Sequence, residues 1–138
     1  MNTAVKTAEL LGFKGVDVDF DSFIRKGFSS QVATHLKTAL DLSDFVLAQY
    51  IGVSIKTLQR KRESHTRFTL QESDRMYRIA RIMAKAALVF GGDDEAREWM
   101  MEKQFILDQA IPFILMQTEA GAQEVEDALG RIASGVLV

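Results

Sequence analysis

The sequence predicts an all-α protein, and three observations support this prediction. Apolar side chains recur at intervals of three and four residues through most of the chain, the period of a helix with one buried face. A single proline, Pro112, leaves long helices possible almost everywhere. No stretch alternates apolar and polar residues for long enough to form a strand. With 47% apolar residues among 138, the chain can bury one sizeable core, or a smaller core with an appended subdomain.

The first 28 residues are interpreted as an N-terminal arm. Residues 3–11 can form a short helix that stops at Gly12, whereas residues 12–28 mix Gly, Asp and Phe without a sustained period. We therefore expect the first domain to occupy residues 29–90 and a second one to occupy residues 91–138.

Capping residues and glycines divide residues 29–90 into four helices. A first helix begins at Ser30, where apolar residues recur every four positions. Ser43 caps a second helix that ends at Gly52, and Ser54 caps a third one shortly afterwards. Thr69 and Glu72 form a capping box that opens the longest helix.

Residues 91–138 contain shorter helices. Two consecutive glycines end the long helix, and Asp93 or Asp94 is expected to cap the next one. Pro112 starts a short helix, and Thr118 caps a last helix that runs through Ile132.

Two short helices joined by a corner at Gly52 are what a helix-turn-helix requires. A small residue, Ala48, stands where the first helix backs onto the second, and glycine frees the backbone for the turn. Apolar residues on both helices are expected to pack onto the body of the domain. They are Leu47, Ile51, Val53, Ile55 and Leu58.

The second of these helices is rich in polar and basic residues that can enter a major groove. Arg60 can donate two hydrogen bonds to guanine, and Gln59 can pair with adenine. Lys61 and Arg62 are expected to contact phosphates, as is Arg67. The alternative is an ordinary helical hairpin with a solvated basic face. The candidate DNA-binding residues are Ser54, Lys56, Thr57, Gln59, Arg60, Lys61 and Arg62.

Charge is distributed unevenly, although the net charge is only −2. Residues 56–85 hold nine basic side chains against three acidic ones, whereas residues 86–138 hold ten acidic against three basic. The basic segment suits nucleic-acid phosphates and the acidic end repels them. Double-stranded DNA is therefore the expected partner of the first domain.

Several kinds of chemistry are not expected. The chain has no cysteine, no secretory signal at its start and no apolar run of membrane-spanning length, so we expect a cytoplasmic protein without membrane contact. His35 and His65 lack metal-ligand spacing, and the glycines at 91 and 92 run into acids that would repel a phosphate. We expect no metal, no cofactor, no catalytic residues and no enzymatic activity.

The last predicted helix is amphipathic and leads to an apolar end. Ala122, Val125, Leu129 and Ile132 form one stripe. Beyond Gly135 the sequence closes with Val136, Leu137 and Val138, which either fold back on the core or contact a partner.

The chain from about residue 30 to residue 138 resembles the Xre, ParS and MbcA group of antitoxins. The resemblance begins with LSDFVLAQYIGVSIKTLQRKRES and continues through the long helix to the closing stretch. Its most specific residues are Ser54, Thr57, Leu58 and Arg60, then Glu72, Ser73, Asp74 and Arg75, then Trp99, and finally Gly121, Val125, Leu129, Gly130, Arg131, Ile132, Gly135 and Val136.

The resemblance implies a helix-turn-helix domain followed by a small helical toxin-binding domain. The partner would be a RES-type toxin that consumes NAD, neutralised when the C-terminal domain covers its active site. Members of the group typically form homodimers and repress their own operon together with the toxin. The toxin-binding residues that it implies are Trp99, Leu129, Arg131, Ile132, Gly135, Val136, Leu137 and Val138.

This chain departs from the group in one stretch. Asp108 and Gln109 stand where the group has two glycines, and Phe113 and Ile114 replace a leucine followed by a polar residue. Two other interpretations stay open, a stand-alone transcriptional repressor without a toxin and an adaptor whose helix-turn-helix has lost DNA contact. A neighbouring toxin gene would favour the antitoxin over the stand-alone repressor.

Overall fold

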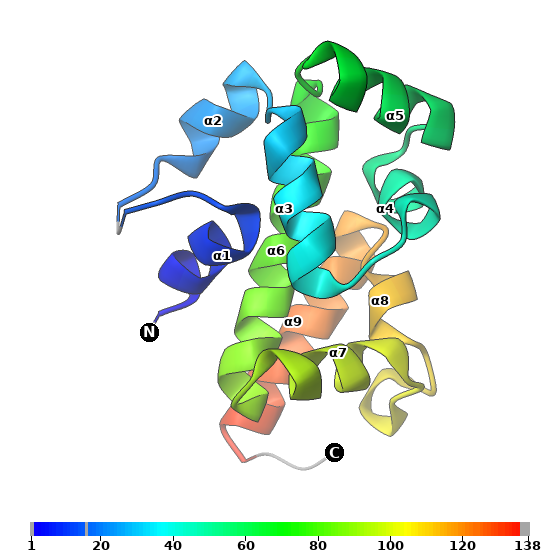
Figure 1. The fold of residues 1–138 in the computed structure, drawn as a ribbon. Helices are drawn as coiled ribbons and strands as arrows, with labels where there is room; N and C mark the ends of the chain where they lie inside the picture. The colour runs from blue at the N-terminus through cyan, green and yellow to red at the C-terminus, as the bar shows by residue number, and fades with distance from the viewer. Residues whose placement is uncertain (1, 16, 136–138) are drawn as a thin grey trace. The chain divides into compact units, whose positions relative to one another are not determined.

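The computed structural model describes residues 2–15 and 17–135, and it confirms the all-α prediction for them (Figure 1). Within these ranges the β pairing is limited to one isolated antiparallel bridge between Gln104 and Ala110. The helices are α1 (Thr3–Leu11), α2 (Phe20–Lys26), α3 (Ser30–Leu40), α4 (Asp44–Ile51), α5 (Ile55–Ser64), α6 (Leu70–Phe90), α7 (Asp93–Met101), the 3-10 helix η1 (Phe105–Leu107), α8 (Pro112–Leu115) and α9 (Glu119–Ala133).

The helices form two compact units, which we call the N-terminal unit and the C-terminal unit. The N-terminal unit comprises Ala4–Ala80, and the C-terminal unit comprises residues 81–135 with Asn2 and Thr3. Helix α6 supplies its first half to one unit and its second half to the other. This division falls ten residues before the predicted boundary at residues 90 and 91, which stays a prediction.

Most predicted helix starts are confirmed by cap hydrogen bonds. The Ser43 hydroxyl accepts a hydrogen bond from the Val46 amide at 3.2 Å, and Thr118 accepts one from Gly121 at 3.0 Å. Such side chains satisfy amides that have no partner inside the helix. The capping box is also present, because the Thr69 amide donates to Glu72 at 2.9 Å and the Glu72 amide donates to Thr69 at 3.1 Å.

The predicted cap of α7 is wrong. The helix begins at Asp93 itself, and Gly92 occupies the cap position without a side-chain hydrogen bond. Asp93, Asp94 and Glu95 therefore lie within the first turn, where their negative charge is favourable next to the positive end of the helix dipole.

Residues 17–28, part of the segment interpreted as an N-terminal arm, belong to the compact N-terminal unit. They contain a helix, α2, that the sequence pattern did not reveal, and they contact the corner between α5 and α6. The Phe28 amide donates to the buried Ser73 hydroxyl at 2.8 Å, and the Phe68 amide donates to the Phe28 carbonyl at 2.9 Å. Arg67 closes the same contact by donating to the Gly27 carbonyl at 2.8 Å.

Aromatic side chains fill the space between this segment and the rest of the N-terminal unit. The ring of Phe13 lies 4.7 Å from that of Phe23 and 5.7 Å from that of Phe28 between centroids. Phe20 lies 5.0 Å from Tyr77 on α6. The four phenylalanines that lacked a helical period thus form an aromatic cluster, which is stabilised by ring packing and apolar burial.

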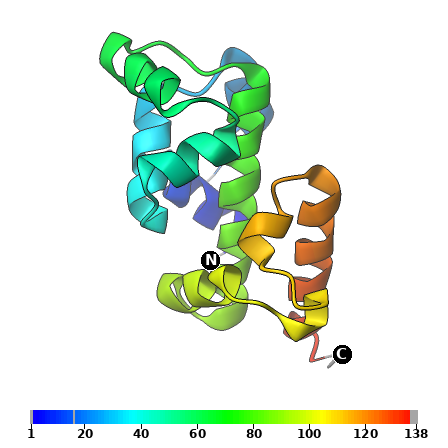
Figure 2. The same ribbon diagram turned by 90° about the vertical axis from the view of Figure 1, so that its right-hand side faces the viewer.

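Each unit has its own apolar core. In the N-terminal unit the core contains Leu11, Leu36, Leu47, Ile51, Leu58 and Met76. In the C-terminal unit, η1 and α8 run alongside α9 (Figure 2). There the core contains Ile82, Met83, Ala96, Met100, Phe113, Met116, Val125 and Leu129.

Two further contacts hold α9 within the C-terminal unit. Arg81 on α6 makes a two-pronged ion pair with Glu126, at 2.8 and 3.2 Å, and Lys85 donates to the Glu126 carbonyl at 3.0 Å. Gly121 allows α9 to start close to α8, because a Cβ there would collide with the Leu115 carbonyl oxygen. None of the helices in the described ranges combines the length and apolarity needed to cross a membrane.

Candidate nucleic-acid interface and partner-binding surface

Helices α4 and α5 form the predicted helix-turn-helix, and the corner between them depends on glycine. Gly52 has a φ of 88°, and its amide donates to the Ala48 carbonyl at 2.9 Å. A φ in this range strains residues that have a Cβ. A Cβ at Gly52 would also collide with the guanidinium of Arg75, which donates to the Ile51 carbonyl at 2.9 Å. Arg75 therefore fixes the end of α4 and is not directed at DNA.

Lys61 is a structural residue, which corrects its assignment to the DNA-binding set. The residue is only 8% exposed. Its ammonium lies 3.1 Å from the Glu72 carboxylate, donates to the Arg67 carbonyl at 3.2 Å, and stands 5.1 Å from the centre of the Phe68 ring. These contacts tie α5 to the start of α6 and use two of the three ammonium donors within the protein.

Glu72 therefore belongs to the capping box of α6 and is also the partner of Lys61. Burial raises the pKa of this carboxyl, but the hydrogen bond from the Thr69 amide and the Lys61 ammonium outweigh burial and hold the pKa below its ordinary value. The carboxylate is therefore ionised near neutral pH and stabilises the corner between the two helices.

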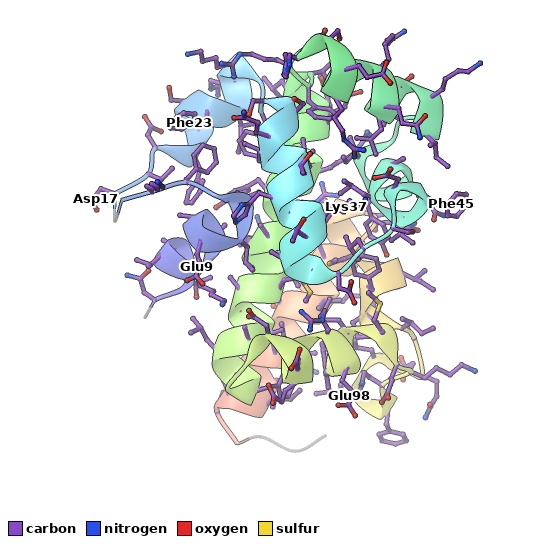
Figure 3. The ribbon with its side chains drawn as sticks, in the orientation of Figure 1. Glu9, Asp17, Phe23, Lys37, Phe45 and Glu98 are labelled. Atoms are coloured by element: carbon purple, nitrogen blue, oxygen red, sulfur yellow. The ribbon has the colours of Figure 1, made fainter. Side chains whose placement is uncertain are left out.

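Arg62 is engaged within the protein, although its side chain is 36% exposed, and its phosphate contact stays a prediction. Its guanidinium contacts both carboxylate oxygens of Asp44, at 2.9 and 3.4 Å, and Lys37 on α3 lies 3.1 Å from the same carboxylate. The hydrogen bond from Arg62 lowers the pKa of Asp44. This three-residue cluster joins α3, α4 and α5 and fixes the orientation of α5 (Figure 3 labels Lys37).

The outward face of α5 carries the remaining candidates. Lys56, Gln59 and Arg60 are exposed, and within the described residues neither the Lys56 ammonium nor the Arg60 guanidinium has a hydrogen bond or ion pair. Thr57 is half-buried and accepts a hydrogen bond from Ser54, whose hydroxyl also caps the helix. Lys56, Gln59 and Arg60 are therefore available to base edges and phosphates, whereas Ser54 and Thr57 mainly hold the helix start.

Two apolar side chains of the helix-turn-helix are unexpectedly exposed. Ile55, assigned to the packing set, is 38% exposed, which corrects that assignment, and Phe45 at the start of α4 is 63% exposed. Figure 3 shows Phe45 pointing away from the helices of the unit. Ile55 is next to Lys56 and suits contact with a thymine methyl group. Ile55 is the first residue of α5. The spacing of apolar residues at three and four positions does not show whether a residue at the very start of a helix is buried.

Few cations of the basic segment 56–85 are free to bind phosphate. Arg67 and Arg75 donate to backbone carbonyls, Arg81 pairs with Glu126, and Lys85 contacts the Glu126 carbonyl. Most of this positive charge serves the fold. The count of basic residues therefore overstated the size of the interface.

The candidate toxin-binding residues differ in exposure. Leu129 has no exposed surface and belongs to the core, which corrects its assignment to the partner surface. Trp99 is half-buried with its ring 5.3 Å from that of Phe90. Arg131 and Gly135 are exposed and Ile132 is half-buried, so these three can contribute to a surface. Val136, Leu137 and Val138 lie outside the described residues.

A cavity of about 210 Å³ lies beside Arg131. It is lined by acidic side chains from two segments, Asp108 from the loop after η1 and Glu124 and Asp127 from α9. This cavity can receive a basic side chain of a partner. In the part of the chain that the structure describes, no three His, Asp or Glu side chains come together as metal ligands.

Comparisons with known proteins agree with this arrangement. Residues 19–81 match the family model of the antitoxin Xre-like helix-turn-helix domain. Residues 85–135 match that of the antitoxin Xre/MbcA/ParS C-terminal toxin-binding domain.

Three curated relatives carry the name Antitoxin Xre. The protein from Yersinia enterocolitica is 37% identical over 116 residues, covering 82% of this chain and 77% of its own length. Relatives from Photorhabdus laumondii and Pseudomonas putida are 34% and 32% identical, and the chain covers 59% and 52% of their lengths. The resemblance expected from the sequence is thereby confirmed. The chain belongs to the Xre antitoxin family, with a helix-turn-helix domain followed by a C-terminal toxin-binding domain.

Proposed function

We propose that this chain neutralises a cognate RES-type toxin through its C-terminal unit and represses its own operon through α5. The observation that carries the proposal is the match of residues 85–135 to a toxin-binding domain. The protein acts by binding and not by catalysis, and it does so in the cytoplasm, where both operator DNA and a toxin that consumes NAD are found.

The charges of the two units support different partners. The N-terminal unit has twelve basic and nine acidic side chains, whereas residues 81–135 have five basic and ten acidic ones. A site that holds NAD must bind a pyrophosphate, for which proteins use basic side chains and helix N-termini. An acidic C-terminal unit complements such a site and disfavours DNA.

A truncation tests the toxin-binding part of the proposal. Deleting residues 131–138 should abolish neutralisation, because it removes the exposed Arg131 and Gly135 together with the apolar end of the chain. The deletion leaves the buried face of α9 intact, since Ala122, Val125, Ala128 and Leu129 all precede it. The readout is growth of cells that express the toxin. A truncated chain that still protects these cells would contradict the proposal.

A substitution on α5 tests the DNA-binding part. Replacing Arg60 by Ala should weaken binding to the operator by about 1 to 3 kcal/mol if Arg60 reads a guanine. Protection against the toxin should be unchanged, because Arg60 lies in the other unit. Gel shifts with the chain's own promoter measure the effect, and an unaltered preference among operator sequences would rule out base reading by Arg60.

Operator binding is expected to involve a homodimer, because half-sites one helical turn apart are read by paired recognition helices. The stand-alone repressor is separated from the antitoxin by co-purification with the product of the neighbouring gene. A chain that binds its operator and no toxin would be a repressor alone. A chain that binds the toxin and leaves the mobility of its promoter unchanged at low salt would be an adaptor.

A further inference from the structure

The segment between α7 and α8 is a closed loop that holds Phe105 in solvent. Phe105 is 75% exposed, the highest value among the large apolar side chains found exposed in the described ranges. Eight such side chains are exposed there, and three of them, Met101, Phe105 and Ile114, fall within fourteen consecutive residues of the C-terminal unit. Single exposed apolar residues are common, whereas three within one short segment make that segment a candidate interaction site.

Hydrogen bonds fix the loop before any partner arrives. The Gln104 amide donates to the Ala110 carbonyl at 3.0 Å, and the Gln109 amide donates back to the Gln104 carbonyl at 2.9 Å. The side-chain amide of Gln104 also donates to the Trp99 carbonyl at 2.8 Å. An aromatic residue on such a closed loop loses little further entropy on binding, which favours affinity.

Two consecutive residues of the loop have a left-handed backbone, and the first of them, Asp108, caps η1. Asp108 and Gln109 have φ values of 53° and 68°, and the left-handed region costs residues other than glycine about 1 to 2 kcal/mol. Strained backbone of this kind is concentrated at binding sites.

Charge around the loop indicates the chemistry of the partner surface. Asp108 lines the 210 Å³ cavity with Glu124 and Asp127, and Glu102 is exposed shortly before Phe105. Lys103 and Arg131 are the exposed basic residues near this segment in the sequence or the cavity. A complementary surface has an apolar pocket for an aromatic ring and basic side chains at its rim.

We propose that Phe105 is an aromatic anchor that inserts into an apolar, basic-rimmed pocket of the cognate toxin. The toxin is the occupant because the loop lies inside the stretch that matches a toxin-binding domain. This inference rests on the proposed function. It adds the loop around Phe105 to the toxin-binding surface, which the predicted toxin-binding residues did not include.

The test compares two exposed phenylalanines, one in each unit. Full-length wild-type chain, Phe105→Ser and Phe45→Ser are titrated against the purified product of the neighbouring gene, and each is also tested for operator binding. Phe105→Ser should raise the dissociation constant for the toxin at least ~30-fold, as loss of an interface anchor does. Phe45→Ser should leave that constant within ~3-fold, because Phe45 lies on α4 of the other unit.

The outcomes separate this inference from the proposed function. If wild-type chain binds the toxin and Phe105→Ser binds it within ~3-fold of wild type, the anchor is refuted while toxin binding stands. If Phe105→Ser changes the oligomeric state and not the toxin affinity, a second copy of the chain occupies the surface and the inference is again wrong. If wild-type chain fails to bind the toxin, the proposed function itself fails.

Discussion

Replacing Lys61 by Met separates the structural role of this residue from the DNA contact that its position on α5 first indicated. Methionine keeps most of the apolar stem but removes the ammonium. The change therefore deletes the 3.1 Å contact with Glu72, the 3.2 Å hydrogen bond to the Arg67 carbonyl and the contact with the Phe68 ring.

The expected loss of stability follows from these contacts. Breaking a buried ion pair costs about 3 to 5 kcal/mol when the remaining charge has no other partner. Glu72 retains the Thr69 amide at 2.9 Å and its side chain is 14% exposed, so part of this cost is avoided. We expect Lys61→Met to lower the free energy of unfolding by about 2 kcal/mol, near the value of a hydrogen bond to a charged group.

Urea unfolding measures the loss, and Lys56→Met is the matched control on the same helix. Lys56 is exposed, so its substitution should change stability by less than about 0.5 kcal/mol. If Lys56 contacts a phosphate, Lys56→Met should weaken operator binding. The slope of the logarithm of the binding constant against the logarithm of the salt concentration should then become smaller in magnitude by about 1. Folded Lys61→Met should keep wild-type operator affinity. Unchanged stability with weakened operator binding in Lys61→Met would refute the structural role.

Three further predictions follow from the caps and corners. Because the pKa values of Asp44 and Glu72 are lowered in the folded protein, the stability that they supply is present above the unfolded values of about 3.9 and 4.3 and lost as pH falls through the folded ones. Urea unfolding between pH 7 and pH 3 should show this loss, and stability that rises below pH 5 would contradict it. Gly52→Ala should lower the free energy of unfolding by about 2 kcal/mol, because it combines a left-handed φ with a collision at Arg75. Thermal unfolding measures this loss, and a midpoint equal to that of the wild type would argue against the strain. Gln109→Gly should raise the free energy of unfolding by about 1 kcal/mol, because glycine adopts the left-handed backbone at that residue without strain. Urea unfolding measures the gain, and a destabilised variant would show that the Gln109 side chain compensates for the strain.

The parts of the fold that sequence could predict depend on local interactions. Ser43, Ser54, Thr118 and the pair Thr69 and Glu72 each act over three residues, so the spacing alone identifies them. The same holds for the turn at Gly52. The helix-turn-helix was therefore predicted almost to the residue.

The errors concern side chains whose partners are distant in sequence. Lys61 meets Glu72 eleven residues later, and Arg62 meets Asp44 eighteen residues earlier. The sequence places both residues on the basic helix but does not reveal these distant partners. The prediction therefore overestimated the number of basic side chains that α5 exposes. Leu129 was included with its exposed neighbours, although it continues the apolar stripe of α9 and is buried.

The N-terminal segment shows another limit. Phe13 and residues 17–28 are held by an aromatic cluster and by a hydrogen bond from Phe28 to Ser73, forty-five residues away, and neither contact follows a helical period. Phe105 illustrates the opposite case. A departure from the glycines of its group was visible in the sequence at Asp108 and Gln109, but only the structure shows that both residues are left-handed and that Phe105 is exposed in the same loop.

The most direct test of the account is to co-express this chain with the product of its neighbouring gene, purify the pair and weigh the complex by native mass spectrometry. The account predicts a stable complex that survives purification with wild-type chain and is lost when residues 131–138 are deleted, while the truncated chain still binds operator DNA. A wild-type chain that is folded and binds operator DNA, yet purifies without the toxin, would contradict it.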